Sequence, residues 1–176
     1  MKVKEPRLLA LMGVLTALGV ATSHLLAIPV GVAKVFPVQH TLNVIGGVIL
    51  GPGPAALVAF VVGLLRNMLG TGTPLAFPGG IFGALLAGAL YRRFRRVPAA
   101  MVGELLGTGL LGAVAAWPVA VLVMGRSAAA TTFIVPFAMS SAAGAIIGGT
   151  LTPLILRALG ATGYRQEGKG SGAWSA

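Results

Sequence analysis

Long apolar runs, separated by short segments that contain proline, glycine or arginine, take up most of this 176-residue chain. Only 9% of the residues are charged, whereas a soluble domain carries about 25%. The chain therefore lacks the polar surface that would keep it in solution, and its length accommodates about six spans of roughly 20 residues. We predict an all-α integral membrane protein with six transmembrane helices, a single domain over residues 1–160 and a flexible tail over residues 161–176.

Proline and glycine indicate where these spans end. Residues 29–38 and 70–80 are predicted loops, and the Gly-Pro-Gly-Pro run at 51–54 is a predicted break between helices. The second helix covers only about 18 Å of a core that is ~30 Å thick. It must therefore begin earlier than predicted, or be tilted and shielded by protein. The predicted helices are 8–28, 39–50, 54–69, 81–91, 98–124 and 132–159.

Basic residues are distributed unevenly between the two ends of the predicted spans. Ten lie near the termini or between the fourth and fifth spans, and three lie on the opposite side. Because positive charge collects on the cytoplasmic side of a membrane protein, both termini are predicted to be cytoplasmic. The basic residues flank apolar runs and do not form one face, so the net charge of +10 does not indicate a nucleic-acid partner.

Small residues recur every four positions along the first span, at Gly13, Ala17 and Ala21. This spacing places them on one helix face, where another helix can approach closely. The partner is either a helix of this chain or a helix of another protein.

Polar residues and helix-breaking residues are concentrated between residues 36 and 83. An unpaired polar group in hydrocarbon costs several kcal/mol, so such groups are retained where they line a cavity or pair with neighbours. We predict a small-molecule pocket in the exterior half of the membrane, suited to an uncharged or weakly charged heterocycle. The candidate substrate-binding residues are His40, Asn43, Arg66, Asn67, Thr71, Thr73, Phe77 and Trp117.

Several of these residues also have simpler explanations. His24 and His40 could lie among lipid headgroups, and Trp117 could anchor the chain at the membrane interface. Arg66 could extend to a lipid phosphate. The amides of Asn43 and Asn67 are harder to explain in this way, because they need partners.

The sequence offers little for catalysis or metal binding. Cysteine is absent and the acids are Glu5, Glu104 and Glu167. For Glu104, an ion pair with one of the arginines in 92–96 is the simplest explanation. Topology places it in the opposite half from the histidines, so no general acid–base pair is expected. We predict no enzyme activity, no catalytic residue and no metal site.

A run in the tail imitates a phosphate-binding loop. Residues 163–169 have its spacing, but Gly170 replaces the Ser or Thr that would hold Mg²⁺, and no strand precedes the run. ATP is therefore not expected to be used by this chain, and uphill transport would need partner ATPase subunits.

The central stretch resembles the ThiW family, the predicted thiazole-specific S-components of energy-coupling factor (ECF) transporters. The motifs are HTLNVIGGVILGP from His40 and LLRNMLGTGTPLAFPGGIFGALLAGALYRR from Leu64. The resemblance implies a six-helix prokaryotic plasma-membrane protein that binds 4-methyl-5-(2-hydroxyethyl)thiazole, a thiamine precursor, near the outer face. It also implies partners, a membrane scaffold subunit and two ATPases, with the scaffold contacting an AxxxA pattern that Ala17 and Ala21 match.

Alternative functions remain open at this stage. The chain could bind thiamine, pyridoxine or another vitamin, although the absence of an acid in the predicted outer half argues against cationic thiamine. It could also be a stand-alone membrane facilitator. An enzyme acting on lipid is a weaker alternative, and it would need His24 or His40.

Overall fold

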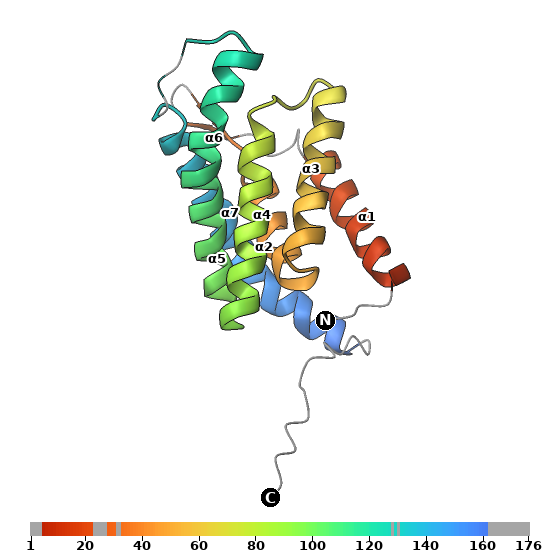
Figure 1. Ribbon diagram of the computed structural model, residues 1–176. Helices are drawn as coiled ribbons and strands as arrows, with labels where there is room; N and C mark the ends of the chain where they lie inside the picture. Colours follow the sequence, from red (N-terminus) through yellow and green to blue (C-terminus); the bar gives the residue numbers. More distant parts are fainter. Residues whose placement is uncertain (1–4, 23–27, 31–32, 128, 130, 162–176) are drawn as a thin grey trace, which may run out of the picture.

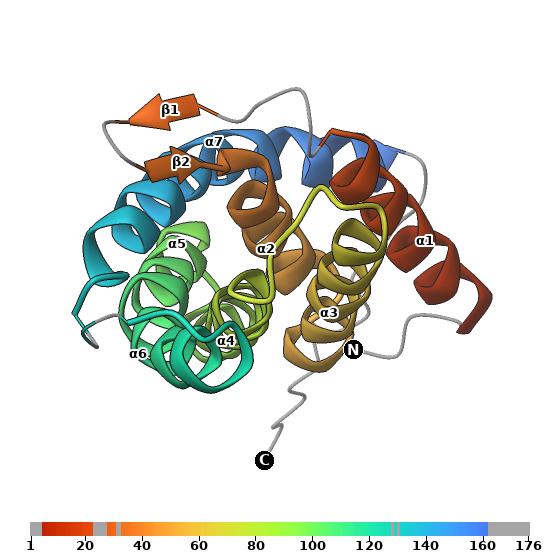
Figure 2. The same ribbon diagram turned by 90° about the horizontal axis from the view of Figure 1, so that it is seen from above.

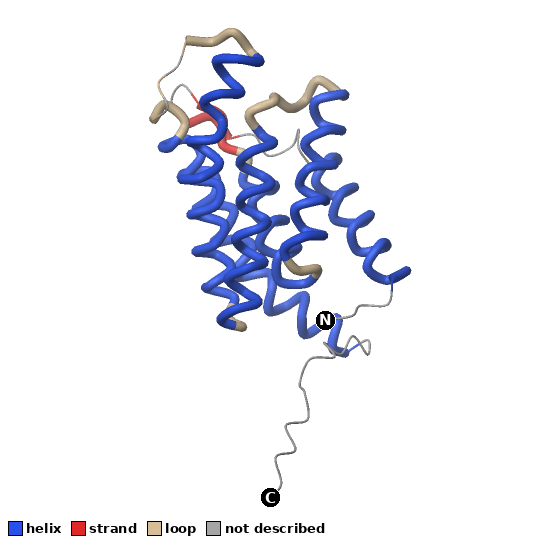
Figure 3. Tube along the Cα trace, in the orientation of Figure 1, coloured by secondary structure: helices blue, strands red, loops and turns tan. Residues whose placement is uncertain are grey.

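Helices make up nearly all of the described part of the chain in the computed structural model (Figures 1 and 3). The structure describes residues 5–22, 28–30, 33–127, 129 and 131–161. The first four helices are α1 Glu5–Ala21, α2 Pro37–Ile49, α3 Pro52–Met68 and α4 Ala76–Phe94. Four elements then follow one another without a break: α5 Val97–Leu106, η1 Gly107–Gly112, α6 Ala113–Pro118 and η2 Val119–Val123. The last helix is α7 Ile134–Ala161. The predicted all-helical class is confirmed for this part, except for one short hairpin.

Helix α2 lies at the centre of the bundle, with α3, α4, α5 and α7 around it (Figure 2). Its side chains are buried on nearly every side, including Val44, Ile45 and Val48. Helix α7 approaches it closely because Gly144 and Gly148 face its backbone, where a Cβ at either position would meet atoms of α2. These two glycines form the small-residue pair that favours close helix packing.

The segment predicted as the first loop contains a β-hairpin. Strand β1 Ile28–Val30 pairs antiparallel with β2 Ala33–Val35. Valine and isoleucine favour extended backbone, which explains why this short segment pairs with itself. The hairpin lies beside α7 in Figure 2. Just after it, the backbone N–H of Phe36 donates to Ser140 Oγ at 2.9 Å.

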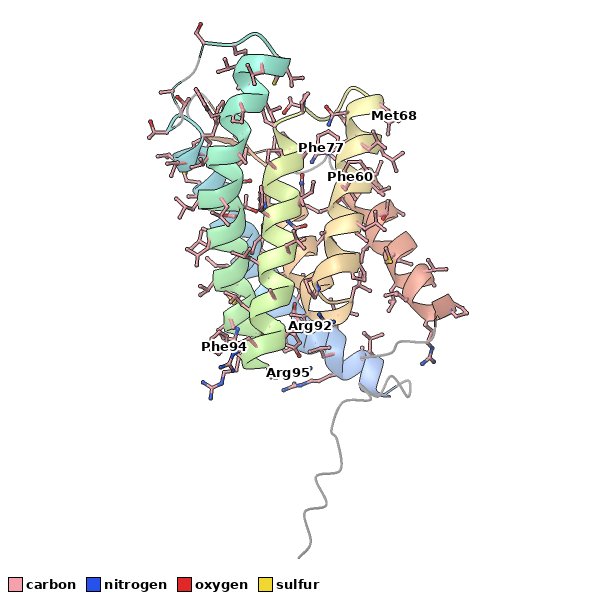
Figure 4. All side chains as sticks on the ribbon, in the orientation of Figure 1. Phe60, Met68, Phe77, Arg92, Phe94 and Arg95 are labelled. Carbon is pink, nitrogen blue, oxygen red and sulfur yellow. The ribbon has the colours of Figure 1, made fainter. Side chains whose placement is uncertain are left out.

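The bundle has two chemically different ends. The start of α1, the connection between α4 and α5 and the end of α7 lie together at the lower end in Figure 1, which we call the arginine end. Arg92 and Arg95 lie there in Figure 4, whereas Met68 lies at the opposite end. We call that opposite end the loop end, because it carries the hairpin and the α3–α4 connection.

Helix α4 begins earlier than predicted. It starts at Ala76, so Phe77, Pro78 and Gly79 form its first turn and do not belong to a loop. Proline is tolerated there because the first backbone N–H groups of a helix have no partner within it.

Within the part of the chain that the structure describes, two helices are long and apolar enough to cross a membrane, Val97–Val123 and Ile134–Gly160. The apolar helices Pro6–Ala21 and Pro52–Met68 are shorter. Helix α2, with 13 residues, covers about 20 Å. The count of six spans and the cytoplasmic termini stay predictions. Apart from Ala161, the predicted tail lies outside the described residues, as does His24.

Candidate functional site

A carboxylate buried inside the bundle gathers polar side chains from two helices, α2 and η1. Glu104 of α5 is 0% exposed. Its Oε1 lies 2.7 Å from His40 Nδ1, 3.3 Å from Asn43 Nδ2 and 2.7 Å from Thr108 Oγ1. We call these four residues the Glu104 cluster. A buried carboxylate is stable only when other groups replace its lost hydration, and here three possible donors converge on one of its two oxygens.

Helix α4 completes this cluster with its backbone. Asn43 Nδ2 donates to the carbonyl of Gly80 at 3.2 Å, and Thr108 Oγ1 lies 2.9 Å from the carbonyl of Gly79. A Cβ at Gly83 would collide with both carboxylate oxygens of Glu104 and with Thr108 Oγ1. The glycines of α4 therefore provide the space in which the cluster packs.

The cluster overturns two predictions about Glu104. It pairs with His40 and not with an arginine in 92–96, because those arginines are exposed at the arginine end whereas Glu104 is fully buried. His40 and Glu104 also do not lie in opposite halves. His40 is nine residues from the end of α2 and Glu104 seven residues from the start of α5. These separations correspond to about 13 Å and 10 Å along the two helices.

This contact also removes the sequence argument that no acid–base pair could form, since an imidazole and a carboxylate lie within hydrogen-bond reach. It likewise weakens the argument against a cationic ligand, which depended on the absence of an acid near the predicted site residues.

A second polar group surrounds Arg66 at the end of α3. Arg66 Nη1 donates to Gln39 Oε1 at 2.7 Å, and Nη2 donates to the carbonyl of Thr71 at 3.3 Å. Its guanidinium carbon lies 5.1 Å from the centre of the Phe36 ring, in the arrangement of a cation–π contact. We call these four residues the Arg66 cluster. The simpler explanation, that Arg66 extends toward lipid phosphate, is wrong because the side chain is buried.

The two clusters are neighbours along α2. Gln39 and Asn43 are four residues apart, so they share one face of the helix. Both contact the start of α4: Gln39 Nε2 lies 3.5 Å from the carbonyl of Ala76, and Asn43 donates to that of Gly80. The clusters therefore lie about one helical turn, ~5.4 Å, apart on α2.

Helix geometry is irregular where Thr108 contributes. The six residues of η1 form a π-helix that continues directly from α5. Such segments are rare and occur frequently at functional sites. This irregularity makes the Glu104 cluster the strongest candidate site in the described residues.

A comparison with models of known protein families identifies the family of this chain. Residues 9–159 match the model described as thiamine-precursor transporter protein (ThiW). The chain belongs to the ThiW family. No curated protein and no solved structure gives a significant match.

Membership of the ThiW family makes the chain a membrane transporter protein for a thiamine precursor, with a small molecule as its substrate. The family is one of transporters.

The structure brings together only some of the residues predicted for the ThiW substrate site. His40 and Asn43 belong to the Glu104 cluster, and Arg66 and Thr71 to the Arg66 cluster. Asn67 Nδ2 instead donates to the carbonyls of Gly63, at 2.8 Å, and Thr73, at 3.2 Å. Asn67 therefore ties the α3–α4 connection to α3.

The two predicted aromatic residues have different surroundings. Phe77 packs against Phe60, with ring centres 5.6 Å apart, and its ring lies against Gly63 (Figure 4). Trp117 is 42% exposed on α6, a helix that packs on α4 and α7. Phe77 is thus close to Arg66, since Gly63 and Arg66 are three residues apart on α3.

Sequence reasoning missed Glu104, Thr108 and Gln39 as candidate site residues. A signal was available, because Glu104 and Thr108 are four residues apart and therefore share a helix face. Gln39 is four residues before Asn43 for the same reason. The sequence alone did not show at which depth in the bundle α2 and α5 contact each other.

The small residues of the first span have no partner helix on their own face in the described structure. Gly13, Ala17 and Ala21 are exposed on α1, whereas the neighbouring Gly19 is buried against Val62 of α3. Helix α1 therefore packs on the bundle through a different face from the one that carries the small residues.

Proposed function

We propose that this ThiW family member is the substrate-binding subunit, or S-component, of an ECF importer in the prokaryotic plasma membrane. It captures 4-methyl-5-(2-hydroxyethyl)thiazole from the exterior side. A membrane scaffold subunit and two ATPases are its partners, and those ATPases use the ATP. The chain itself needs no cofactor. The family match supports the coarser part of this proposal, transport of a thiamine precursor.

The observation that carries the proposal is the buried polar surface shared by α2, α3, α4 and α5. Two hydrogen-bonded clusters in a mostly apolar bundle cost desolvation energy, which a purely structural helix packing could avoid. Hydroxyethylthiazole offers a flat ring, one nitrogen acceptor and one hydroxyl group. The clusters provide donors and acceptors for the polar groups, and Phe77 provides an aromatic surface near Arg66.

The predicted site residues take different parts in this proposal. His40 and Asn43 contact the polar end of the ligand directly. Arg66 and Thr71 shape the opposite side of the pocket, and Asn67 and Thr73 hold the α3–α4 connection over it. Trp117 has the weakest support, because its side chain is 42% exposed.

Thermal unfolding of the purified chain tests the ligand directly, since a molecule that binds only the folded state raises the apparent stability. The panel contains hydroxyethylthiazole, thiamine, pyridoxine and riboflavin. We expect stabilisation by hydroxyethylthiazole equivalent to about 2.7 kcal/mol at a ligand concentration 100 times the Kd. Riboflavin is the control for a large heterocycle that should not fit. Stabilisation by any other compound, and none by the thiazole, would refute the proposed substrate.

Thiamine is the second candidate substrate, because Glu104 lies in contact with His40 and Asn43. A buried carboxylate can balance the positive charge of the thiazolium ring. The thermal-unfolding experiment distinguishes the two candidate substrates, because its panel contains both thiamine and hydroxyethylthiazole. A stand-alone facilitator is the remaining alternative, and it would give uptake into liposomes that contain this chain without ATPases.

The exposed small residues of α1 support the proposed contact with a scaffold helix. We expect Ala17→Trp and Ala21→Trp to abolish co-purification with the scaffold subunit and ATPases, because each bulky ring prevents close helix approach. Thermal stability and ligand binding should be unchanged, since both positions are exposed.

Leu122→Trp is the matched control, as Leu122 is 82% exposed on η2 at the loop end. This variant should co-purify normally. An intact complex in both α1 variants would show that the partner binds elsewhere.

A further inference from the structure

The carboxylate of Glu104 is satisfied on one side only. His40, Asn43 and Thr108 all approach Oε1, whereas Oε2 is buried with no hydrogen-bond partner. Among the described residues, the one other buried side-chain nitrogen or oxygen without a partner is Arg66 Nε. A buried charged oxygen left unpaired is costly, and a native structure rarely retains one without a purpose.

The direction of Oε2 is fixed by its surroundings. Three contacts hold Oε1, and the backbone of Gly83 packs against both oxygens so closely that a Cβ there would collide with them. The carboxylate therefore has little freedom to rotate and share its partners between its two oxygens. One carboxylate oxygen, Oε2, is therefore left as an acceptor without a donor among the described residues.

We propose that Glu104 is a specificity-determining residue of the substrate site, and that its Oε2 accepts a hydrogen bond from the hydroxyl group of the substrate. The proposal rests on the function proposed above and names the chemical class that the site selects: small neutral heterocycles that carry an alcohol. His40, Asn43 and Thr108 hold the carboxylate in place. Thr108 acts only as a positioning residue, whereas His40 and Asn43 also contact the polar end of the ligand.

The unpartnered donor in the neighbouring cluster fits the same ligand class. Arg66 Nε can donate a hydrogen bond, and its cluster lies one turn of α2 away from that of Glu104. A hydroxyethylthiazole carries an acceptor in its ring and a donor at the end of its side chain. Arg66 Nε is therefore a donor for the ring acceptor of the ligand, and Glu104 Oε2 is an acceptor for its hydroxyl group.

The test compares two ligands in two proteins by isothermal titration calorimetry of the full chain in lipid nanodiscs. The ligands are hydroxyethylthiazole and 5-ethyl-4-methylthiazole, which lacks only the hydroxyl group. A hydrogen bond to a charged acceptor predicts that the wild type binds the alcohol roughly 10- to 150-fold more tightly. In Glu104→Gln we expect this ratio to fall at least fivefold, because the amide oxygen keeps the place of Oε1 but a neutral NH₂ group replaces Oε2.

Thr152→Val is the matched control, because Thr152 is fully buried on α7 and bonds only to its own helix, at the carbonyl of Gly148. In this variant the ratio of the affinities for the two thiazoles should equal that of the wild type. If Glu104→Gln fails to fold, Glu104→Asp is used instead, since it withdraws the carboxylate by one methylene and should lower the same ratio.

Each other outcome contradicts the proposal in a recognisable way. Equal binding of both thiazoles by the wild type, or an unchanged ratio in the Glu104 variant, overturns the role of Glu104 and leaves the proposed function intact. A folded variant that binds neither ligand overturns a role confined to the hydroxyl group. Failure of the wild type to bind any thiazole overturns the proposed function and this inference together.

Discussion

Replacing His40 with leucine is expected to lower the free energy of unfolding by about 3–5 kcal/mol. The substitution removes the ring nitrogen that lies 2.7 Å from Glu104 Oε1 and leaves a fully buried carboxylate with fewer donors. Leucine fills a similar volume, so the loss reports the polar contact that the buried Glu104 side chain loses and not a large cavity. Reversible unfolding in mixed micelles measures the effect.

The double variant His40→Leu/Glu104→Leu separates this explanation from a general loss of packing. Removing both partners of a buried pair can be nearly neutral, so the double variant should recover at least half of the lost stability. A double variant less stable than His40→Leu alone would show that the pair is not the source of the effect.

Gly107→Ala is the second substitution with a large expected effect, a loss of about 2–3 kcal/mol. A Cβ at Gly107 would collide with the carbonyl group of Phe82 and with the Cα of Gly83, which are backbone atoms of α4 that cannot move independently. The helices would have to separate, and the space that holds Glu104 and Thr108 would change with them. The shift in thermal unfolding temperature measures the loss.

Gly53→Ala is the matched control for this packing, because Gly53 lies in α3 with no atom near the added Cβ. Alanine is intrinsically favoured over glycine in a helix, so this variant should be unchanged or slightly more stable. Equal effects at the two positions would contradict close packing between α4 and η1.

Much of the helical framework could be predicted from composition and helix-breaking residues. Apolar runs predicted helices in the right order. The predicted break at 51–54 lies at the junction between α2 and α3, but residues 52–54 already belong to α3, which begins at Pro52. The hairpin at 28–35 and the early start of α4 were missed. A short valine-rich pair of strands has no signal beyond weak β-propensity, and Pro78 reads as a loop residue although it lies in the first turn of a helix.

The candidate site was only partly predictable, because polar residue types do not reveal their partners. Asn43 and Asn67 looked equivalent in sequence, yet Asn43 contacts a buried carboxylate whereas Asn67 holds a connection. Glu104 was assigned to nearby arginines because they are close in sequence. Its real partner, His40, is 64 residues away and reaches it because α2 is short and central.

Locating the sulfur atom of the ligand tests most directly whether the polar clusters around α2 surround a thiazole. The chain has no cysteine and six methionines, so an anomalous difference map of a crystal of the complex contains few protein sulfur sites. The account predicts one additional peak between α2, α4 and α5, beside Asn43, Gly80 and Glu104. An additional peak on the lipid-facing surface, or none in crystals soaked with saturating hydroxyethylthiazole, would contradict it.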